Sequence, residues 1–333
     1  MAFLYLTEQG SVLRKRGERL IVEKDAAVLL DVECHKINAV LVFGNVQITT
    51  QSLKELLEHG IELAILTQKG KLIGQLTSPA TKNIELRIAQ FKRYGEDGFI
   101  KSFSTEIVKG KIKNSLQFVR GFSYNHPEVE LNKELAELEA ALQTADGQPA
   151  LDSLNGVEGT AARHYFSAFR KMILGQFGFD GRRKHPSPDP VNALLSLGYT
   201  MVYNEISSLL DGMGFDPYLG YYHKPDYGRA SLASDLQEEF RAPLVDRLTL
   251  YLINNRMVKE SDFYRNPKGE GVQMTRDALK MYFAEYEKFM NNEFLHPAAK
   301  EKTTFRKCFR IQIEGLGAFI KGERAYIPFH MEV

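Results

Sequence analysis

The sequence contains no tryptophan and only two cysteines, Cys34 and Cys308. Two cysteines are too few for the disulfide framework of a small secreted protein, and neither lies in the CxxC spacing of a zinc ribbon. We therefore interpret both as reduced core residues. The aromatic volume of the core must come instead from the 21 Phe and 15 Tyr residues.

Signals for export and membrane insertion are also missing. No uncharged apolar run reaches the roughly 18 residues that a membrane span requires. The N-terminal segment MAFLYLTEQGSVLRKRG lacks the basic-then-apolar order and the small-residue cleavage site of a signal peptide. These absences predict a cytoplasmic protein with no membrane partner.

Several common catalytic motifs are absent as well. The sequence has no Walker A motif, which makes nucleoside-triphosphate turnover an unfavoured function. It has no HExxH motif, paired cysteines or EF-hand loop, so the usual zinc and calcium sites are not predicted. The net charge of +1 neither requires nor excludes a polyanionic partner, because such binding depends on local basic patches.

The first eighty residues have the pattern of short β-strands. Apolar and β-branched runs predict strands at residues 3–6, 19–23, 39–43, 62–66 and 71–76, and glycines between them indicate turns. Ser52 and Glu55 form a capping-box pattern that predicts one short helix. Because most strands follow one another without a helix, the pattern favours a small sandwich or rolled sheet over a parallel βαβ layout.

After residue 80 the pattern becomes helical. Apolar residues at helical spacing predict helices near residues 81–94, 131–142, 190–210, 232–254 and 275–292, with linkers at 142–151, 177–190 and 266–271. A length of 333 residues suits two domains. We therefore predict an α+β protein with a β-rich domain at 1–80, followed by a larger all-α domain at 81–333.

Three segments of the helical part carry candidate metal ligands. Glu158 stands between Gly156 and Gly159 at a predicted helix start, and the alternative is a first-turn glutamate that complements the helix dipole. His223 follows a loop rich in glycine and aromatic residues. Histidine often binds metals through a neutral ring nitrogen, although a lone histidine is more often packed or solvated.

The third segment places Asp235 and Glu238 three residues apart on a predicted helix, so both carboxylates share one face. Like charges on one face repel, and a cation between them would remove that cost. The alternative is a solvated acidic face balanced by Arg241. Together, one histidine and several carboxylates suit Mg²⁺ or Mn²⁺ better than Zn²⁺, and such a site typically serves phosphoryl chemistry.

Basic residues cluster around these segments, and solvated surface is the alternative explanation for each. Clusters in a nearly neutral chain favour a polyanionic partner such as DNA. They comprise Lys101, Lys109, Lys111 and Lys113; Arg163, Arg170 and Lys171; Arg182, Arg183 and Lys184; and Lys300, Lys302, Arg306, Lys307 and Arg310.

Longer motifs link the separate segments to one family. The chain resembles the CRISPR-associated protein one family, the metal-dependent DNA endonucleases and integrases of spacer acquisition. The motifs that carry the resemblance extend over essentially the whole chain: Glu158–Phe166, Asp189–Tyr199, Gly220–His223, Ser231–Arg241, Phe305–Gln312 and Tyr326–Phe329.

The resemblance implies a site, a reaction and partners. It assigns Glu158, His223 and Glu238 to the metal-ligand positions and Asp235 to a further acidic position that is important for activity. Arg163 and Tyr165 are implied to contact phosphate or to support the ligands, and Arg182, Arg183 and Lys184 are further candidate DNA contacts. Asn192 matches a motif position, where a capping or packing role is the alternative.

By the same resemblance, the reaction is attack of a DNA 3′-hydroxyl on a phosphodiester with Mg²⁺ or Mn²⁺, in antiviral defence. The β-rich domain would form a homodimer, and two dimers would join a small ferredoxin-like partner protein to insert a DNA fragment into the repeat array. Two alternatives stay open: a DNA-binding assembly scaffold with weak or no catalysis, and a metallohydrolase of small phosphoesters.

Overall fold

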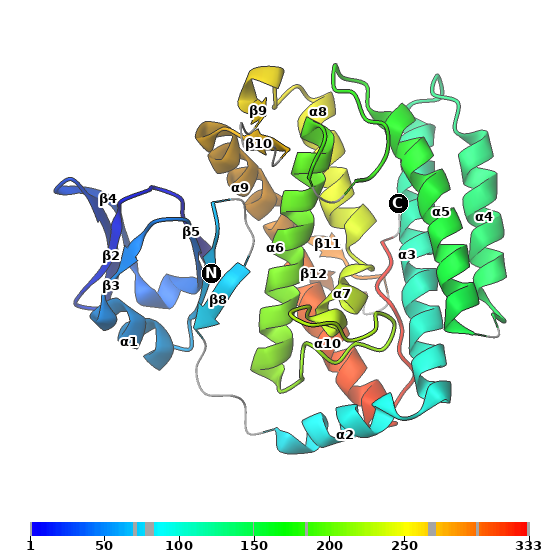
Figure 1. Cartoon of the computed structure of the whole chain (residues 1–333), viewed down its shortest axis with the longest axis horizontal. Helices are drawn as coiled ribbons and strands as arrows, with labels where there is room; N and C mark the ends of the chain where they lie inside the picture. Colours follow the sequence, from blue (N-terminus) through cyan, green and yellow to red (C-terminus); the bar gives the residue numbers. More distant parts are fainter. Residues whose placement is uncertain are drawn as a thin grey trace. The chain divides into compact units, whose positions relative to one another are not determined.

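The computed structural model describes residues 2–68, 72–76, 83–148, 150–183, 186–265, 271–297 and 300–331. The chain forms two compact units. The first comprises Met1–Thr81 and Leu279–Phe283, and the second comprises Lys82–Ala278 and Ala284–Val333. The predicted α+β class, with a strand-rich N-terminal part before a larger helical part, is confirmed (Figure 1).

Two four-stranded sheets build the first unit. One has the order β1 (Ala2–Leu6), β5 (Ile37–Phe43), β7 (Glu62–Leu66) and β8 (Leu72–Leu76), with β5 parallel to both neighbours and β8 antiparallel to β7. The other has the order β4 (Ala27–Glu33), β3 (Arg19–Lys24), β2 (Val12–Arg16) and β6 (Gln47–Ile48). The strands β2, β4 and β6 were not predicted.

Both sheets contribute to one hydrophobic core. Leu13 and Val22 from the second sheet cluster with Val40 and Leu63 from the first, and Leu56 of helix α1 (Thr50–Glu58) joins them. This packing agrees with the predicted sandwich or roll. A βαβ element is present within it, contrary to the preference drawn from the sequence pattern, because α1 lies between the parallel strands β5 and β7.

The predicted capping box of α1 is wrong in its register. Thr49 caps the helix by accepting a hydrogen bond from the backbone N–H of Ser52 at 3.3 Å. The Ser52 hydroxyl instead donates to the Leu13 carbonyl at 3.0 Å, and the Glu55 carboxylate pairs with Lys15. Glu55 is therefore committed to the neighbouring sheet, whereas the Ser52 hydroxyl contacts both that sheet and Thr49 at the helix start.

The second unit is mainly helical, and Figure 1 shows α3, α4 and α5 side by side. Its helices are α2 (Ile84–Tyr94), α3 (Asp97–Asn125), α4 (Asn132–Ala145), α5 (Leu151–Met172), α6 (Pro190–Met213), α7 (Ser231–Gln237), α8 (Arg247–Asn254), α9 (Arg276–Asn291) and α10 (Phe305–Ile320). Two small sheets, β9 (Phe263–Arg265) with β10 (Val272–Met274) and β11 (Phe294–Leu295) with β12 (Lys302–Thr303), were not predicted. Within the described ranges, every helix is too short or too polar to span a bilayer.

Three helical predictions need correction. The long helix α3 was not predicted, and α4 extends to Ala145 into the predicted linker. The single helix predicted for residues 232–254 is interrupted by a π-helical turn over Arg241–Asp246, labelled η2. Pro243 lies inside this turn. Proline has no backbone N–H to donate and its ring clashes with the preceding turn, which explains the interruption.

Candidate metal centre

Each of the three predicted metal ligands comes from a different part of the second unit. Glu158 lies in the middle of α5, which begins at Leu151, so both the predicted helix start and the first-turn alternative are wrong. The helix dipole acts mainly on the first turn of about four residues. His223 lies in the loop between α6 and α7, and Glu238 directly follows α7.

Helix α7 is buried along its whole length. Asp235 is 0% exposed and Glu238 is 3% exposed, so the solvated acidic face that the sequence left open is wrong. Buried carboxylates need hydrogen bonds or opposite charges to offset the loss of hydration. The two residues meet this requirement in different ways.

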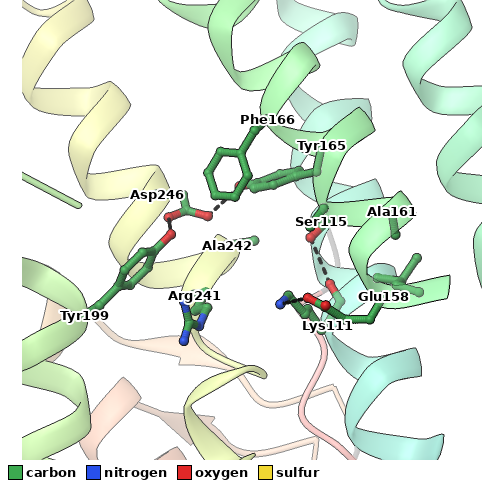
Figure 2. Close-up of a pocket in the computed structure, with 12 residues that line it drawn as sticks. Lys111, Ser115, Glu158, Ala161, Tyr165, Phe166, Tyr199, Arg241, Ala242 and Asp246 are labelled. Carbon is green, nitrogen blue, oxygen red and sulfur yellow. Dashed lines mark hydrogen bonds and ion pairs between the residues drawn. The ribbon is translucent and has the colours of Figure 1, made fainter. Parts of the chain in front are cut away.

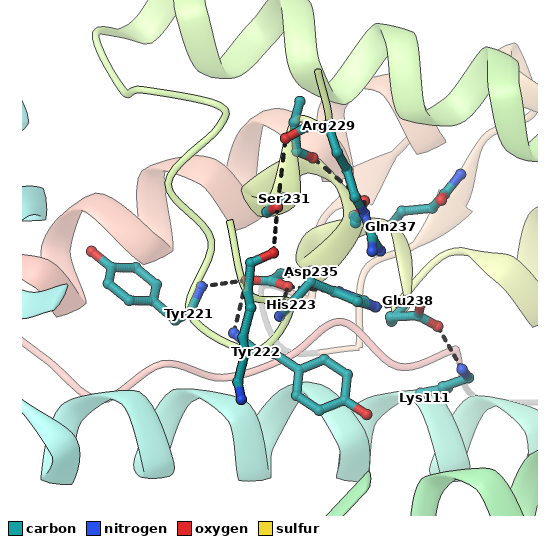
Figure 3. Close-up of polar contacts among 12 residues, drawn as sticks. Lys111, Tyr221, Tyr222, His223, Arg229, Ser231, Asp235, Gln237 and Glu238 are labelled. Carbon is teal, nitrogen blue, oxygen red and sulfur yellow. Dashed lines mark hydrogen bonds and ion pairs between the residues drawn. The ribbon is translucent and has the colours of Figure 1, made fainter. Parts of the chain in front are cut away.

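Asp235 is held entirely by hydrogen bonds from the loop that carries His223 (Figure 3). Its Oδ2 accepts from the backbone N–H groups of Tyr221 at 2.7 Å and Tyr222 at 3.1 Å. Its Oδ1 accepts from the His223 backbone N–H at 2.8 Å and lies 2.8 Å from His223 Nδ1. Because a carboxylate can only accept, Nδ1 carries the hydrogen in this contact, which leaves Nε2 as the ring nitrogen that is available as a metal ligand.

Glu238 lies among positive charges instead. Lys111 of α3 pairs with Glu238 Oε2 at 2.7 Å and also with Glu158 Oε1, so its ammonium bridges the two carboxylates. Arg241 Nη2 lies 3.1 Å from Glu238 Oε1, and His223 Nε2 lies 3.9 Å from the same oxygen. Lys111 thus marks the point on which Glu158 and Glu238 converge.

These charges set the protonation of the centre. Burial by itself would raise the pKa of Glu238, but the charges of Arg241 and Lys111 outweigh it and lower the pKa to about 2. Burial likewise opposes the charge on Lys111, yet Glu238 and Glu158 raise its pKa above the ordinary value. Near neutral pH, Glu238 is therefore ionised and Lys111 is an ammonium.

The types of donor at this point are those that a divalent cation prefers. As the described residues stand, no three His, Cys, Asp or Glu side chains form a group that could hold a metal ion. However, the buried Glu238 Oε2 has no partner among the described residues except the Lys111 ammonium, which lies 2.7 Å away. Two carboxylates and one imidazole nitrogen are suitable ligands for Mn²⁺ or Mg²⁺, and a third carboxylate, that of Asp235, orients the imidazole.

The next carboxylate, Glu239, fixes the C-terminal segment behind the centre. It is 0% exposed. It accepts hydrogen bonds from the Tyr326 hydroxyl, from Gln312 Nε2 at 2.7 Å and from the Phe329 backbone N–H at 2.6 Å. Burial raises its pKa to about 8, although these hydrogen bonds act in the opposite direction. Glu239 therefore serves the fold rather than the metal centre.

A pocket adjoins the centre, and Lys111, Glu158 and Arg241 are among its lining residues (Figure 2). At its far side, Asp246 accepts hydrogen bonds from Tyr165 at 2.6 Å and Tyr199 at 2.5 Å. Burial raises the pKa of Asp246 to about 6, and the two tyrosines moderate the rise. The Arg241 guanidinium lies 4.6 Å from the Tyr199 ring centroid, so Arg241 contacts both this cluster and Glu238.

The predicted DNA contacts differ in accessibility. Arg163 and Arg183 are exposed. Tyr165 is 4% exposed and its hydroxyl is committed to Asp246, so it is not positioned to contact a phosphate. Arg182 is half-buried, with its guanidinium 5.2 Å from the Tyr199 ring centroid. Lys184 lies outside the described residues.

Asn192 has a packing role. It is 0% exposed near the start of α6, and its Oδ1 accepts hydrogen bonds from Arg182 Nη1 at 3.0 Å and from the Arg183 backbone N–H at 2.8 Å. Its Nδ2 donates to the Gly181 carbonyl at 3.0 Å. This is the packing alternative stated from the sequence, and it places the Arg182–Arg183 segment beside α6.

Two residues of the centre were missed as site residues. Lys111 was counted only as one member of a basic cluster, and Arg241 only as a counter-charge to an exposed face. No short-range spacing could have found Lys111, because it lies 47 positions before Glu158 and on a helix that was not predicted. Another predicted cluster member, Arg306, pairs with the carboxylates of Glu205 and Glu287.

Comparisons with known proteins agree with this description. Residues 4–288 match the family model of "CRISPR associated protein Cas1". The CRISPR-associated endonuclease Cas1 3 of Thermus thermophilus is 34% identical over 330 residues, which cover 98% of this chain and 96% of that protein.

Solved structures share the fold. A casposase bound to an integration product has a TM-score of 0.87 at 20% identity, covering 99% of this chain and 93% of that chain. A chain of a Cas6-RT-Cas1–Cas2 complex has a TM-score of 0.84 at 26% identity, and the match covers all of this chain but 36% of that longer chain. The protein described here belongs to the Cas1 family of CRISPR-associated proteins.

Proposed function

We propose that this chain is a divalent-metal-dependent DNA endonuclease and integrase, which inserts captured DNA fragments into a CRISPR array in antiviral defence. The observation that carries the proposal is the convergence of Glu158 and Glu238 on one ammonium, with His223 Nε2 3.9 Å from Glu238. Relatives named as Cas1 endonucleases support the class of reaction. The fold is shared with a casposase bound to an integration product, which supports an integrase.

In the proposed site, Glu158, His223 and Glu238 hold Mg²⁺ or Mn²⁺. The bound ion would polarise the scissile phosphate and stabilise charge that develops on the attacking and leaving oxygens. Asp235 acts by orienting His223, since it holds both the ring and the backbone of that residue. Arg241 keeps Glu238 ionised and directed toward the centre. DNA would approach through contacts that include the exposed Arg163 and Arg183.

We also propose the partners that the family resemblance implies. The β-rich unit would form a homodimer, and a small ferredoxin-like protein would join two dimers around the DNA. A structural relative is part of a complex that contains Cas2, which supports assembly with a second protein. The cytoplasmic location predicted from the sequence stays a prediction.

Substitution of the ligands tests the proposal. Glu158→Ala and His223→Ala should each abolish DNA cutting and strand transfer with Mn²⁺, while circular dichroism shows that the helical fold is retained. Asp152→Ala is the matched control, because Asp152 is an exposed carboxylate on the same helix α5. It should leave both reactions unchanged.

Two results would count against the proposal. Full strand transfer by both ligand variants would show that the site is assigned to the wrong residues. DNA binding by the unmodified protein without cutting or joining under any divalent metal, with its partner protein present, would instead indicate an assembly scaffold.

A further inference from the structure

Lys111 occupies an unusual place for a lysine. Its ammonium lies between two acidic side chains from different elements, at 2.7 Å from Glu238 Oε2 and in contact with Glu158 Oε1. Its side chain is 19% exposed and Glu238 is 3% exposed. Exposed ion pairs contribute little to stability, whereas this one neutralises a carboxylate that has almost no contact with water.

A divalent ion and the ammonium cannot bridge the same oxygens. Carboxylate oxygens bind Mg²⁺ at about 2.0–2.1 Å, so an ion held by Glu158 and Glu238 would take the volume that Lys111 Nζ now fills. Charge leads to the same conclusion. Lys111 and Arg241 now balance Glu158 and Glu238, and a divalent ion added to these four groups would leave two uncompensated positive charges. Departure of the lysine would leave one.

From this geometry we infer that Lys111 is a built-in counter-ion, which bridges Glu158 and Glu238 in the metal-free protein and is displaced when a divalent metal binds. The inference rests on the proposed metal site and adds to it a competitor from the chain itself. The four-carbon stem of lysine can rotate while α3 stays in place. Lys111 thereby offsets part of the negative charge of the metal-free site, at the cost of weaker metal binding.

Two measurements on the intact protein test the displacement. The first is calorimetric titration of MnCl₂ into the unmodified protein and into Lys111→Met, which keeps an unbranched side chain one heavy atom shorter and without the charge. If Lys111 occupies the metal position in about nine of every ten metal-free molecules, only about one in ten is free to bind Mn²⁺. Removal of the ammonium should then tighten Mn²⁺ binding about tenfold. The metal-free Lys111→Met protein should also melt at a lower temperature, because two carboxylates lose their counter-ion.

Lys113→Met is the matched control for the general loss of a positive charge. Lys113 lies on the same helix, and no ion pair joins it to either Glu158 or Glu238, all three of which are described residues. This variant should bind Mn²⁺ with nearly unchanged affinity. An equal increase in Mn²⁺ affinity in both variants would show that only the long-range effect of the positive charge matters, and it would overturn the inference.

The second measurement needs no variant, and so it stays informative if Lys111→Met does not fold. Lysine acetylation by an N-hydroxysuccinimide ester, read by mass spectrometry, should be slow at Lys111 in the metal-free protein and faster with saturating Mn²⁺. Lys113 should react at the same rate in both states. Unchanged reactivity of Lys111 under saturating Mn²⁺ would overturn the displacement.

The two proposals fail in different ways. Suppose that the unmodified protein binds Mn²⁺ and that Glu158→Gln abolishes this binding. If Lys111→Met then binds Mn²⁺ no more tightly and Lys111 is acetylated no faster with Mn²⁺, the metal site stands and the counter-ion role is wrong. If the unmodified protein binds no Mn²⁺, or if Glu158→Gln binds it equally well, the proposed metal site and the role of Lys111 fail together.

Discussion

His223 Nδ1 lies 2.8 Å from Oδ1 of Asp235, and the same oxygen accepts the His223 backbone N–H at 2.8 Å. One buried carboxylate therefore fixes both the position of the histidine and the direction of its ring. Since this contact commits Nδ1, only Nε2 can serve as a ligand. Asp235 therefore positions His223, and its expected importance for activity stays a prediction.

Replacement of Asp235 by Asn should damage this arrangement. One acceptor oxygen becomes an N–H₂ group that faces two N–H donors, so unfolding should become easier by about 1–3 kcal/mol. Mn²⁺ affinity should fall about 10–100-fold, as is typical when a partner of a ligating histidine is lost. Urea unfolding and calorimetry would measure the two effects. Asp226→Asn, at an exposed position in the loop before α7, should show neither.

The backbone around His223 offers a second test. A Cβ at Gly220 would lie 2.7 Å from the backbone carbon of Ser231 and 2.8 Å from the carbonyl oxygen of His223. Gly220→Ala should therefore displace the loop and reduce Mn²⁺ affinity and strand transfer together. Gly159→Ala is the contrasting variant, because a methyl group at this position next to Glu158 would have nothing within 4 Å. It should raise stability by about 0.5–1 kcal/mol. Tighter metal binding by Gly220→Ala would contradict this account.

Variants of Tyr165 and Arg163 should distinguish a residue that stabilises the fold from one that binds DNA. Tyr165→Phe removes a donor to the buried Asp246 carboxyl, so it should cost about 1–3 kcal/mol of stability and leave DNA affinity unchanged. Arg163→Ala should weaken DNA binding and reduce the slope of log K against log salt by about 1. Fluorescence anisotropy over a salt series would measure both. A DNA-binding defect in Tyr165→Phe at full stability would reverse the assignment.

Asp246 should make the free energy of unfolding depend on pH. Its pKa rises from 3.8 to about 6 on folding, so the folded state favours the protonated carboxyl. The stabilisation from this group is fully present below about pH 4 and is lost as the pH rises through about 6, which corresponds to about 3 kcal/mol. Urea unfolding of the unmodified protein and Asp246→Asn from pH 4 to 7 should show this loss as a shrinking difference in unfolding free energy. A difference in unfolding free energy that stays constant from pH 4 to 7 would contradict the raised pKa of Asp246.

The sequence predicted the class and much of the helical fold because local signals were strong there. The predicted helix at 190–210 is confirmed as α6: Asp189 caps it by accepting a hydrogen bond from the Asn192 backbone N–H at 2.8 Å, and Pro190 begins it. Local signals failed where contacts from distant elements decide the structure. Thr49 rather than Ser52 caps α1, since the Ser52 hydroxyl donates to Leu13 in a neighbouring strand.

For the candidate site, spacing alone related only Asp235 to Glu238, and the family motifs added Glu158 and His223. The i,i+3 pattern was compatible with both a buried metal face and a solvated face, because it does not report burial. Lys111 could not be inferred at all, since its role depends on the packing of α3 beside α5 and the segment after α7. Residues that act only through a tertiary contact are not visible in local sequence patterns.

Anomalous diffraction from crystals of the unmodified protein loaded with Mn²⁺ tests the proposed metal site most directly. We expect one strong anomalous peak at about 2.0–2.4 Å from a carboxylate oxygen of Glu158, His223 Nε2 and a carboxylate oxygen of Glu238. The Lys111 ammonium should have left this position in the same map. A Mn²⁺ peak held by other residues, or no peak at these three while Lys111 still bridges Glu158 and Glu238, would contradict it.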